Sequence, residues 1–469
     1  MQQSKRTTAL KKRDLYLQKL IALKDTEPVK VVTGMRRCGK SSLLALMQEY
    51  LRGVGVDQRR IIAMNFESMA FQDMTYKDVY AYIKQKIETL DAAEQGSDMP
   101  TTYLFFDELQ RVDRWEDAIN SFRVDFNCDI YITGSNAYLL SSEYATYLSG
   151  RYVEIKMYPL SFKEFIDFLG YTTEEHRTPT GARKQRIRSS NGALAEESEL
   201  FDAYMRYGGM PAISEMNFNQ SSIMALLEGV YTTVVMRDIL DRENRRGQRR
   251  ITDSELLRRL TLFLADNIGN NTSLNAMCNT LSAEKLIAAR GGQREGERLD
   301  GCLDGRSGGT RSTKPAHQTV AAYVAALKES YFFYEIKRFD IKGRDYLRTL
   351  GKYYIVDVGL RNYLLGFRDR DRGHALENVV YLELLRRGYD VAVGKIDALE
   401  VDFVAQSADE KLYIQVSETM RGDEHRAREL RPLEKVRDNY EKIVLTLDSA
   451  LDDDYNGIRV LNVVDWLLA

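Results

Sequence analysis

A short stretch near the start of the chain, GMRRCGKS at residues 34–41, restricts its fold first. The stretch matches G-x-x-x-x-G-K-[ST], in which glycines let successive backbone N–H groups turn towards one anion. A buried-strand pattern precedes it at residues 29–33, and an amphipathic helical pattern follows it. This setting predicts a phosphate-binding loop, because the positive end of the helix faces the same anion. The alternative is a plain glycine turn.

The residues of this loop predict ATP as the ligand and Mg²⁺ as the cofactor. Lys40 is expected to reach the β and γ phosphates, and the Ser41 hydroxyl is expected to bind Mg²⁺. Gly34, Gly39 and Ser42 complete the predicted nucleotide-binding set.

Two carboxylates follow an apolar strand pattern, TYLFFDE, at residues 102–108. We expect Asp107 to hold the metal ion and Glu108 to polarise the attacking water. A strand end that simply becomes polar is the alternative. The next strand candidate ends in TGSN, where Ser135 or Asn136 is expected to orient water or sense the γ phosphate, unless the pair only forms a turn.

Strand patterns alternate with helical ones through the first third of the chain. This order predicts an α/β fold with a parallel sheet and right-handed crossovers. Ligands of such sheets bind at the carboxyl ends of the strands, where all the polar residues above are expected.

Length and composition place the chain among multidomain globular proteins. With 469 residues, two or three domains are expected, and a net charge of −2 excludes a uniform polycation. The basic start lacks the apolar run of a signal peptide. The sequence has no stretch of 18 apolar residues, so no membrane-spanning helix is expected. We expect a cytoplasmic protein with reduced thiols at Cys38, Cys128, Cys278 and Cys302.

The middle of the chain reads as helical from residue 151 to 250, with a break at RYGGMP. From residue 252, three helical patterns precede two strand candidates, which is the order of a winged helix. A glycine-rich segment at 290–314 interrupts this order, and its composition predicts a disordered insertion. The tail from residue 374 reads as a separate small α/β unit.

Several motifs resemble those of the prokaryotic AAA-type ATPases that carry an additional domain of unknown function. They are GMRRCGKS, LFFDELQ, ITGSN, LSGRY and RYGGMP. The tail resembles that family's C-terminal domain, which implies a restriction-endonuclease-like fold. The resemblance implies that Arg151, in LSGRY, is an arginine finger or sensor, supplied to a neighbouring subunit or in cis. The alternative for Arg151 is a surface arginine before a strand.

The fold class predicted from these features is α/β, with a P-loop AAA-type ATPase core, a helical and winged-helix middle and a nuclease-like tail. The predicted domains are the core at 1–160, its helical extension at 161–250, the winged-helix-like domain at 251–365 and the tail at 366–469.

The tail departs from the nuclease pattern at the residues that its chemistry needs. Glu377 and Asp402 stand where two carboxylates are expected, but the second-strand triplet reads Gln415-Val416-Ser417 in place of Glu-x-Lys. A glutamine is a poor metal ligand and a serine carries no charge. We therefore predict that the fold is kept and that cleavage is lost.

The leading hypothesis is an ATP-hydrolysing switch or remodeller. The alternatives are an ATP-regulated DNA-processing nuclease and a binding module that uses ATP only for assembly. Duplex DNA, a client protein and a second copy of the chain are the candidate partners. Five cations around the predicted wing favour weak duplex binding, and a solvated or protein-docking hairpin is the alternative: Lys337, Arg338, Lys342, Arg344 and Arg348.

Overall fold

The computed structural model divides the chain into two compact units, each with its own core. The structure describes residues 10–92, 100–135, 150–177, 183–240, 251–282, 317–343, 345–448 and 454–469. The first unit comprises residues 1–171, 210–217 and 329–331, and the second comprises 172–209, 218–328 and 332–469. The predicted insertion at 290–314 lies outside the described residues.

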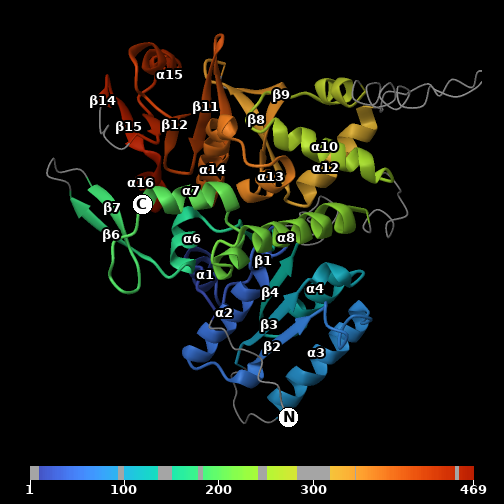
Figure 1. The fold of residues 1–469 in the computed structure, drawn as a ribbon. Helices are drawn as coiled ribbons and strands as arrows, with labels where there is room; N and C mark the ends of the chain where they lie inside the picture. Colours follow the sequence, from blue (N-terminus) through green and yellow to red (C-terminus); the bar gives the residue numbers. More distant parts are fainter. Residues whose placement is uncertain are drawn as a thin grey trace, which may run out of the picture. The chain divides into compact units, whose positions relative to one another are not determined.

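A five-stranded sheet forms the centre of the first unit (Figure 1), and its neighbouring strands all pair in parallel, as predicted. Its strands, in spatial order, are β2 (Ile61–Asn65), β3 (Thr102–Asp107), β4 (Cys128–Gly134), β1 (Val29–Thr33) and β5 (Tyr152–Lys156). The inner strands β1 and β3 are buried along their whole length, because helices cover both faces.

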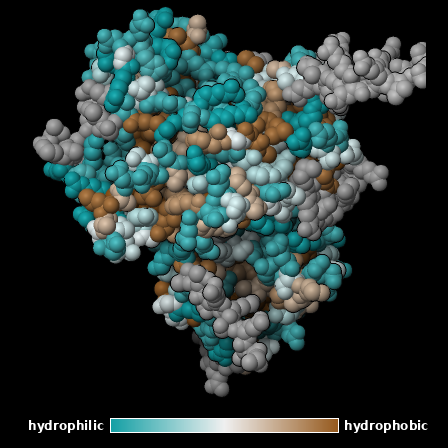
Figure 2. All heavy atoms as spheres, in the orientation of Figure 1, coloured by the Kyte–Doolittle hydropathy of each residue, from teal (hydrophilic) through white to brown (hydrophobic). Residues whose placement is uncertain are grey.

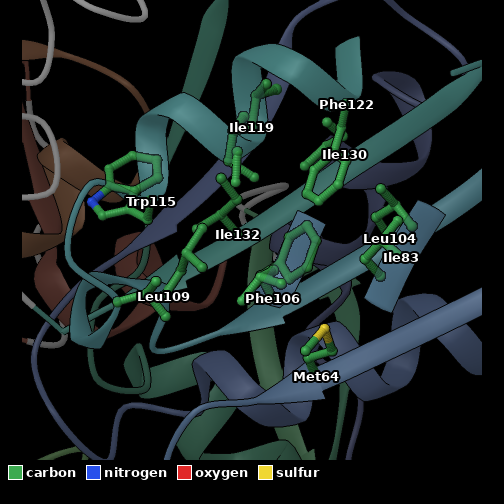
Figure 3. Close-up of a cluster of buried hydrophobic side chains, with 14 of the residues drawn as sticks. Met64, Ile83, Leu104, Phe106, Leu109, Trp115, Ile119, Phe122, Ile130 and Ile132 are labelled. Carbon is green, nitrogen blue, oxygen red and sulfur yellow. The ribbon is translucent and has the colours of Figure 1, made fainter. Parts of the chain in front are cut away.

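Helices α1 (Asp14–Ala22), α2 (Lys40–Gly53), α3 (Tyr76–Asp91), α4 (Trp115–Asp125) and α6 (Phe162–Phe168) belong to the same unit, as do the short 3₁₀ turns Gln58–Arg60, Leu109–Arg111 and Pro211–Glu215. Helix α3 begins at a capping box in which Thr75 and Asp78 bond each other's backbone N–H. Figure 3 shows Phe106 and Ile132 of the sheet packed beneath Ile119 and Phe122 of α4. This apolar layer fixes the strand ends that carry the polar residues.

An eight-stranded mixed sheet organises the second unit. Its strands, in spatial order, are β14 (Asp454–Tyr455), β15 (Ile458–Asn462), β13 (Glu441–Thr446), β12 (Lys411–Ser417), β11 (Leu399–Gln406), β10 (Asp390–Ile396), β8 (Phe333–Asp340) and β9 (Asp345–Ile355). Strand β8 pairs in parallel with β10, with Arg338 opposite Val393. The predicted boundary at 365/366 is therefore not a boundary between sheets: the hairpin assigned to the wing continues the sheet of the tail.

The helices of the second unit are α7 (Glu197–Tyr207), α8 (Gln220–Tyr231), α10 (Ser254–Asp266), α12 (His317–Glu329), α13 (Val358–Leu365), α14 (Arg372–Arg386), α15 (Asp423–Lys435) and α16 (Val463–Leu468), with a π-helical turn at Thr232–Asp238, a 3₁₀ turn at Asp369–Asp371 and a further helical segment at 274–282. The helices and the hairpin β8–β9 follow the order expected of a winged helix. Hydrophilic side chains cover α15 in Figure 2, while its Leu430 and Leu433 are buried.

Three strands depart from the mainly helical prediction for residues 151–250: β5, given above, and two further ones. Strands β6 (Thr172–Arg177) and β7 (Arg183–Arg188) form an antiparallel hairpin. Both strands are rich in charged residues and lack the alternation of apolar and polar side chains that marks a half-buried strand. These two segments therefore carry no pattern that predicts a strand.

The RYGGMP break is explained by a close interlock with α13. The Asp357 carboxylate accepts hydrogen bonds from the backbone N–H of Gly209 (2.7 Å) and of Leu360 (3.0 Å). A Cβ on Gly208 would lie 2.2 Å from that carboxylate, and a Cβ on Gly359 would lie 1.9 Å from the Tyr207 carbonyl oxygen. Neither position has room for a side chain.

We predict that Gly359→Ala lowers the free energy of unfolding by about 3 kcal/mol, because backbone must move to admit the methyl group. Gly373→Ala is the matched control, since its Cβ would meet Glu418 at an ordinary 3.5 Å. Urea unfolding of both variants measures the difference. Equal stability of the two variants would contradict the interlock.

Candidate functional site

The predicted phosphate loop lies between the end of β1 and the start of α2. Gly34 has a φ of 141°, and a Cβ there would lie 2.1 Å from the carbonyl oxygen of Met157. Gly39 has a φ of 105° and caps α2. Both positions require glycine, because a side chain would either collide or strain the backbone.

Lys40 folds back over this loop. Its ammonium donates hydrogen bonds to the carbonyl oxygens of Gly34 (3.0 Å) and Met35 (2.9 Å), and the residue is 5% exposed. Ser41 and Ser42 follow as exposed residues in the first turn of α2, which carries no acidic side chain. The positive end of the helix and the lysine ammonium therefore both favour an anion bound at the loop.

Arg13 holds the loop through hydrogen bonds from its guanidinium, and the sequence did not predict this role. Its guanidinium donates to the carbonyl oxygens of Cys38 (2.9 Å) and Tyr158 (2.8 Å), and it also binds the carboxylate of Glu164. Burial lowers and Glu164 raises the pKa of Arg13, with a net upward shift, so the side chain is charged. Distance along the chain hid this contact: no local motif links Arg13 to the loop.

Asp107 stands at the carboxyl end of β3, as predicted. Its carboxylate accepts hydrogen bonds from the Asn65 amide (3.0 Å) and the Thr133 hydroxyl. Burial raises the pKa of Asp107, and hydrogen bonds from the Thr133 and Ser41 hydroxyls oppose that rise. Ser41 and Asp107, the two predicted metal ligands, thus lie close to each other, and two hard oxygen donors suit Mg²⁺.

Glu108 follows in the left-handed region, with a φ of 57°. Its backbone N–H donates to the Thr133 hydroxyl (3.0 Å), and its Oε2 accepts from Ser135 (3.0 Å) and Gln110 (2.5 Å). A strained backbone held by several bonds is typical of functional sites. Thr133 therefore links the Asp107 carboxylate to the backbone N–H of Glu108, whereas the sequence pointed only to Ser135 and Asn136 of the TGSN motif. Asn136 lies outside the described residues.

Arg151 is exposed and precedes β5, where its carbonyl oxygen accepts from Val29 N (2.9 Å). Because β1 and β5 are parallel, this is the end of the sheet opposite the phosphate loop. The prediction that Arg151 acts in cis, on a nucleotide bound by its own chain, is therefore wrong. Its supply to a neighbouring copy stays a prediction.

A cavity of about 570 Å³ opens beside the loop within the first unit. One part of its lining is polar and comes from Lys40, Ser41, Ser42, Arg36, Arg37, Glu67 and Glu108, and another part is apolar and comes from Leu10, Leu43, Leu46, Met157, Phe168, Pro211 and Ala212. A nucleotide needs both kinds of surface, one for its phosphates and one for its base.

The second unit brings the predicted tail residues together. Asp402 and Gln415 lie on the neighbouring strands β11 and β12, and Asp402 Oδ2 accepts from Val416 N (2.9 Å). Glu377 of α14 and Asp402 each lie 3.9 Å from the ammonium of Lys352. The Ser417 hydroxyl donates a hydrogen bond to the carbonyl oxygen of Thr419 (2.9 Å). Lys352 was missed because it belongs to the hairpin that the sequence assigned to another domain.

Of the five predicted wing cations, the structure describes the side chains of three, and two of these lie beside carboxylates of the same chain. Lys342 pairs with Asp397 (2.6 Å), and Arg338 lies 3.9 Å from Glu400. Lys337 is exposed. Arg344 and the side chain of Arg348 lie outside the described residues. Duplex binding by this hairpin stays a prediction.

Comparison with known proteins agrees with the geometry of the first unit. Residues 26–166 match the family model of an AAA domain, and residues 307–371 match a domain of unknown function, DUF8612. An uncharacterised protein of Haemophilus influenzae is 36% identical over 460 residues, which cover 98% of this chain and 99% of that protein. The chain belongs to the family of that protein.

Two more distant similarities extend over most of the chain. An uncharacterised protein of Methanocaldococcus jannaschii is 25% identical over 94% of this chain and 88% of its own length. Among solved structures, a Walker-type ATPase of Pyrococcus abyssi is 17% identical, with a TM-score of 0.45 over 78% of this chain and 98% of that one.

In the part of the chain that the structure describes, we find no helix both long and apolar enough to cross a membrane.

We predict that Lys40→Ala abolishes nucleotide binding by the AAA domain, because the variant loses the ammonium beside the phosphates. Lys77→Ala, an exposed lysine of α3, is the matched control. Titration with a fluorescent ATP analogue measures both. Binding by Lys40→Ala that equals the wild type would show that the phosphate site is elsewhere.

Proposed function

We propose that the AAA domain binds and hydrolyses ATP with Mg²⁺, and that the protein works as a nucleotide-dependent switch or remodeller. One observation carries the proposal: Lys40 and Ser41, which follow β1, and Asp107 and Glu108, at the end of β3, meet at one edge of the sheet. Thr133, on the intervening strand β4, bonds both carboxylate residues.

The residues of this edge divide the work of phosphoryl transfer. The loop N–H groups and Lys40 hold the phosphates and balance their charge. Ser41 and Asp107 would hold Mg²⁺, which neutralises the charge that develops on the phosphoryl oxygens.

Glu108 is placed to take a proton from water. The bonds that it receives from the described residues Ser135 and Gln110 both reach Oε2. Oε1 therefore remains to accept the proton, while the two bonds fix the orientation of the carboxylate.

We predict that Glu108→Gln binds ATP but hydrolyses it at least about tenfold more slowly, on the scale of a lost general base. Glu116→Gln makes the same change at a buried carboxylate on α4 and is expected to keep turnover. Phosphate release measures both variants. Unchanged turnover in Glu108→Gln would assign the base elsewhere, and a wild type that binds ATP without turnover would favour a module that uses ATP for assembly.

A basic groove in the second unit favours nucleic acid as the partner of this switch. The groove has a volume of about 490 Å³. Its lining includes Lys411, Lys435 and Arg437, Lys342 in its pair with Asp397, the carboxylate of Asp438 and the aromatic rings of Phe339 and Tyr440. Lys411 Nζ lies 5.2 Å from the centroid of the Tyr440 ring, and Tyr440 is 52% exposed. Such a groove suits single-stranded nucleic acid, because the cations can contact its phosphates while the exposed ring stacks on a base.

We predict that Lys435→Ala/Arg437→Ala weakens binding of a fluorescent single-stranded oligonucleotide and lowers its salt dependence by about 1.4 in the log–log slope. Lys77→Ala/Lys84→Ala removes the same charge from α3 and serves as the control. Equal affinity in the two double variants would exclude this groove, and absence of wild-type binding at low salt would favour a client protein.

A further inference from the structure

A buried ammonium occupies the centre of the carboxylate cluster in the second unit. Lys352, on β9, is 4% exposed as a residue. Its Nζ lies 2.7 Å from Glu400 Oε1 and 3.9 Å from both Glu377 Oε2 and Asp402 Oδ1. Three carboxylates from α14 and β11 thus converge on one cation.

Each carboxylate is held in place by a second partner. Asp402 Oδ2 accepts from Val416 N (2.9 Å), and Glu377 Oε2 accepts from the Tyr354 hydroxyl (3.1 Å). Glu400 Oε2 accepts from the Asn271 amide (2.8 Å). The oxygens that surround Lys352 are therefore fixed by the fold.

An arginine and a histidine lie at the margin of this cluster. Arg338 lies 3.9 Å from Glu400, and His374 Nδ1 lies 3.4 Å from Glu377 Oε1. Neither approaches all three carboxylates, so Lys352 is the cation that they share.

The residues present do not fit a divalent metal ion. Gln415 faces Asp402 with an amide whose Nε2 donates to Glu429 (3.2 Å). A metal ion between the carboxylates would lie within a few ångströms of the Lys352 ammonium, and like charges repel strongly in a buried site. No group of three or more His, Cys, Asp or Glu side chains in the described part of the chain has the geometry to hold a metal ion.

We propose that Lys352 is a built-in cation, which takes the place that a divalent metal ion holds in a nuclease-type site. The charge that would activate water is replaced by an ammonium that neutralises and orders the cluster. The second unit is therefore metal-independent and does not cleave phosphodiester bonds. This inference does not depend on ATP hydrolysis, which is measured separately.

The first test counts bound metal ions in the wild type. Electron paramagnetic resonance of Mn²⁺, without nucleotide, is expected to give equal counts for the wild type and Asp402→Asn, and neither protein is expected to nick plasmid DNA with Mg²⁺. One ion fewer in Asp402→Asn, or Mg²⁺-dependent nicking that this variant loses, would overturn the proposal.

The second test removes the built-in cation. Lys352→Ala is expected to lower the thermal midpoint by roughly 10 °C, because buried carboxylates lose their partner. Millimolar Mn²⁺ is expected to restore much of that loss, but not in Lys352→Ala/Asp402→Asn. Lys337→Ala, on the neighbouring strand β8, is the control and is expected to show neither effect.

A Lys352→Ala variant that folds but gains no stability from Mn²⁺ would refute the exchange of ammonium for metal. If this variant does not fold, the ion counts of the wild type and Asp402→Asn still decide the question. The phosphate loop is the same in all these proteins, so differences between them report on the second unit.

Discussion

The phosphate site depends on a close packing contact between Gly34 and the carbonyl oxygen of Met157, which leaves no room for a side chain. That contact fixes the loop at the end of β1. Lys40 then bonds the carbonyl oxygens at the start of the loop, and Arg13 bonds the one at Cys38. A loop held by its own chain can receive phosphates with little ordering cost.

Local sequence was enough to predict the parts of this site that local geometry creates. Lys40, Ser41, Asp107 and Glu108 lie at or after the carboxyl end of a strand, and the parallel sheet brings such strand ends to one edge. Arg13 could not be predicted in the same way. It reaches the loop through tertiary contacts that leave no periodic or spaced pattern.

The second unit shows how non-local strand pairing limits sequence reasoning. The helices and the hairpin β8–β9 follow the predicted order, yet β8 pairs with β10 although residues 341–389 separate the two strands along the chain. The same pairing explains why the domain boundary that the order of helix and strand patterns predicted at 365/366 falls within one sheet. It also explains the position of Lys352: the pairing brings β9 into the sheet of the tail, where the Lys352 ammonium lies among carboxylates of α14 and β11. The contact between Lys352 and the three carboxylates could therefore be found only in the structure.

The central claim is that the loop after β1 recognises the terminal phosphates of a nucleotide. Calorimetric titration of the wild type with ATP, ADP and AMP in the presence of Mg²⁺ tests it most directly. The account predicts that ATP and ADP bind and that AMP binds at least about tenfold more weakly, because AMP lacks the phosphates that Lys40 reaches. Equal affinity for AMP and ATP, or no binding of any of the three, would contradict it.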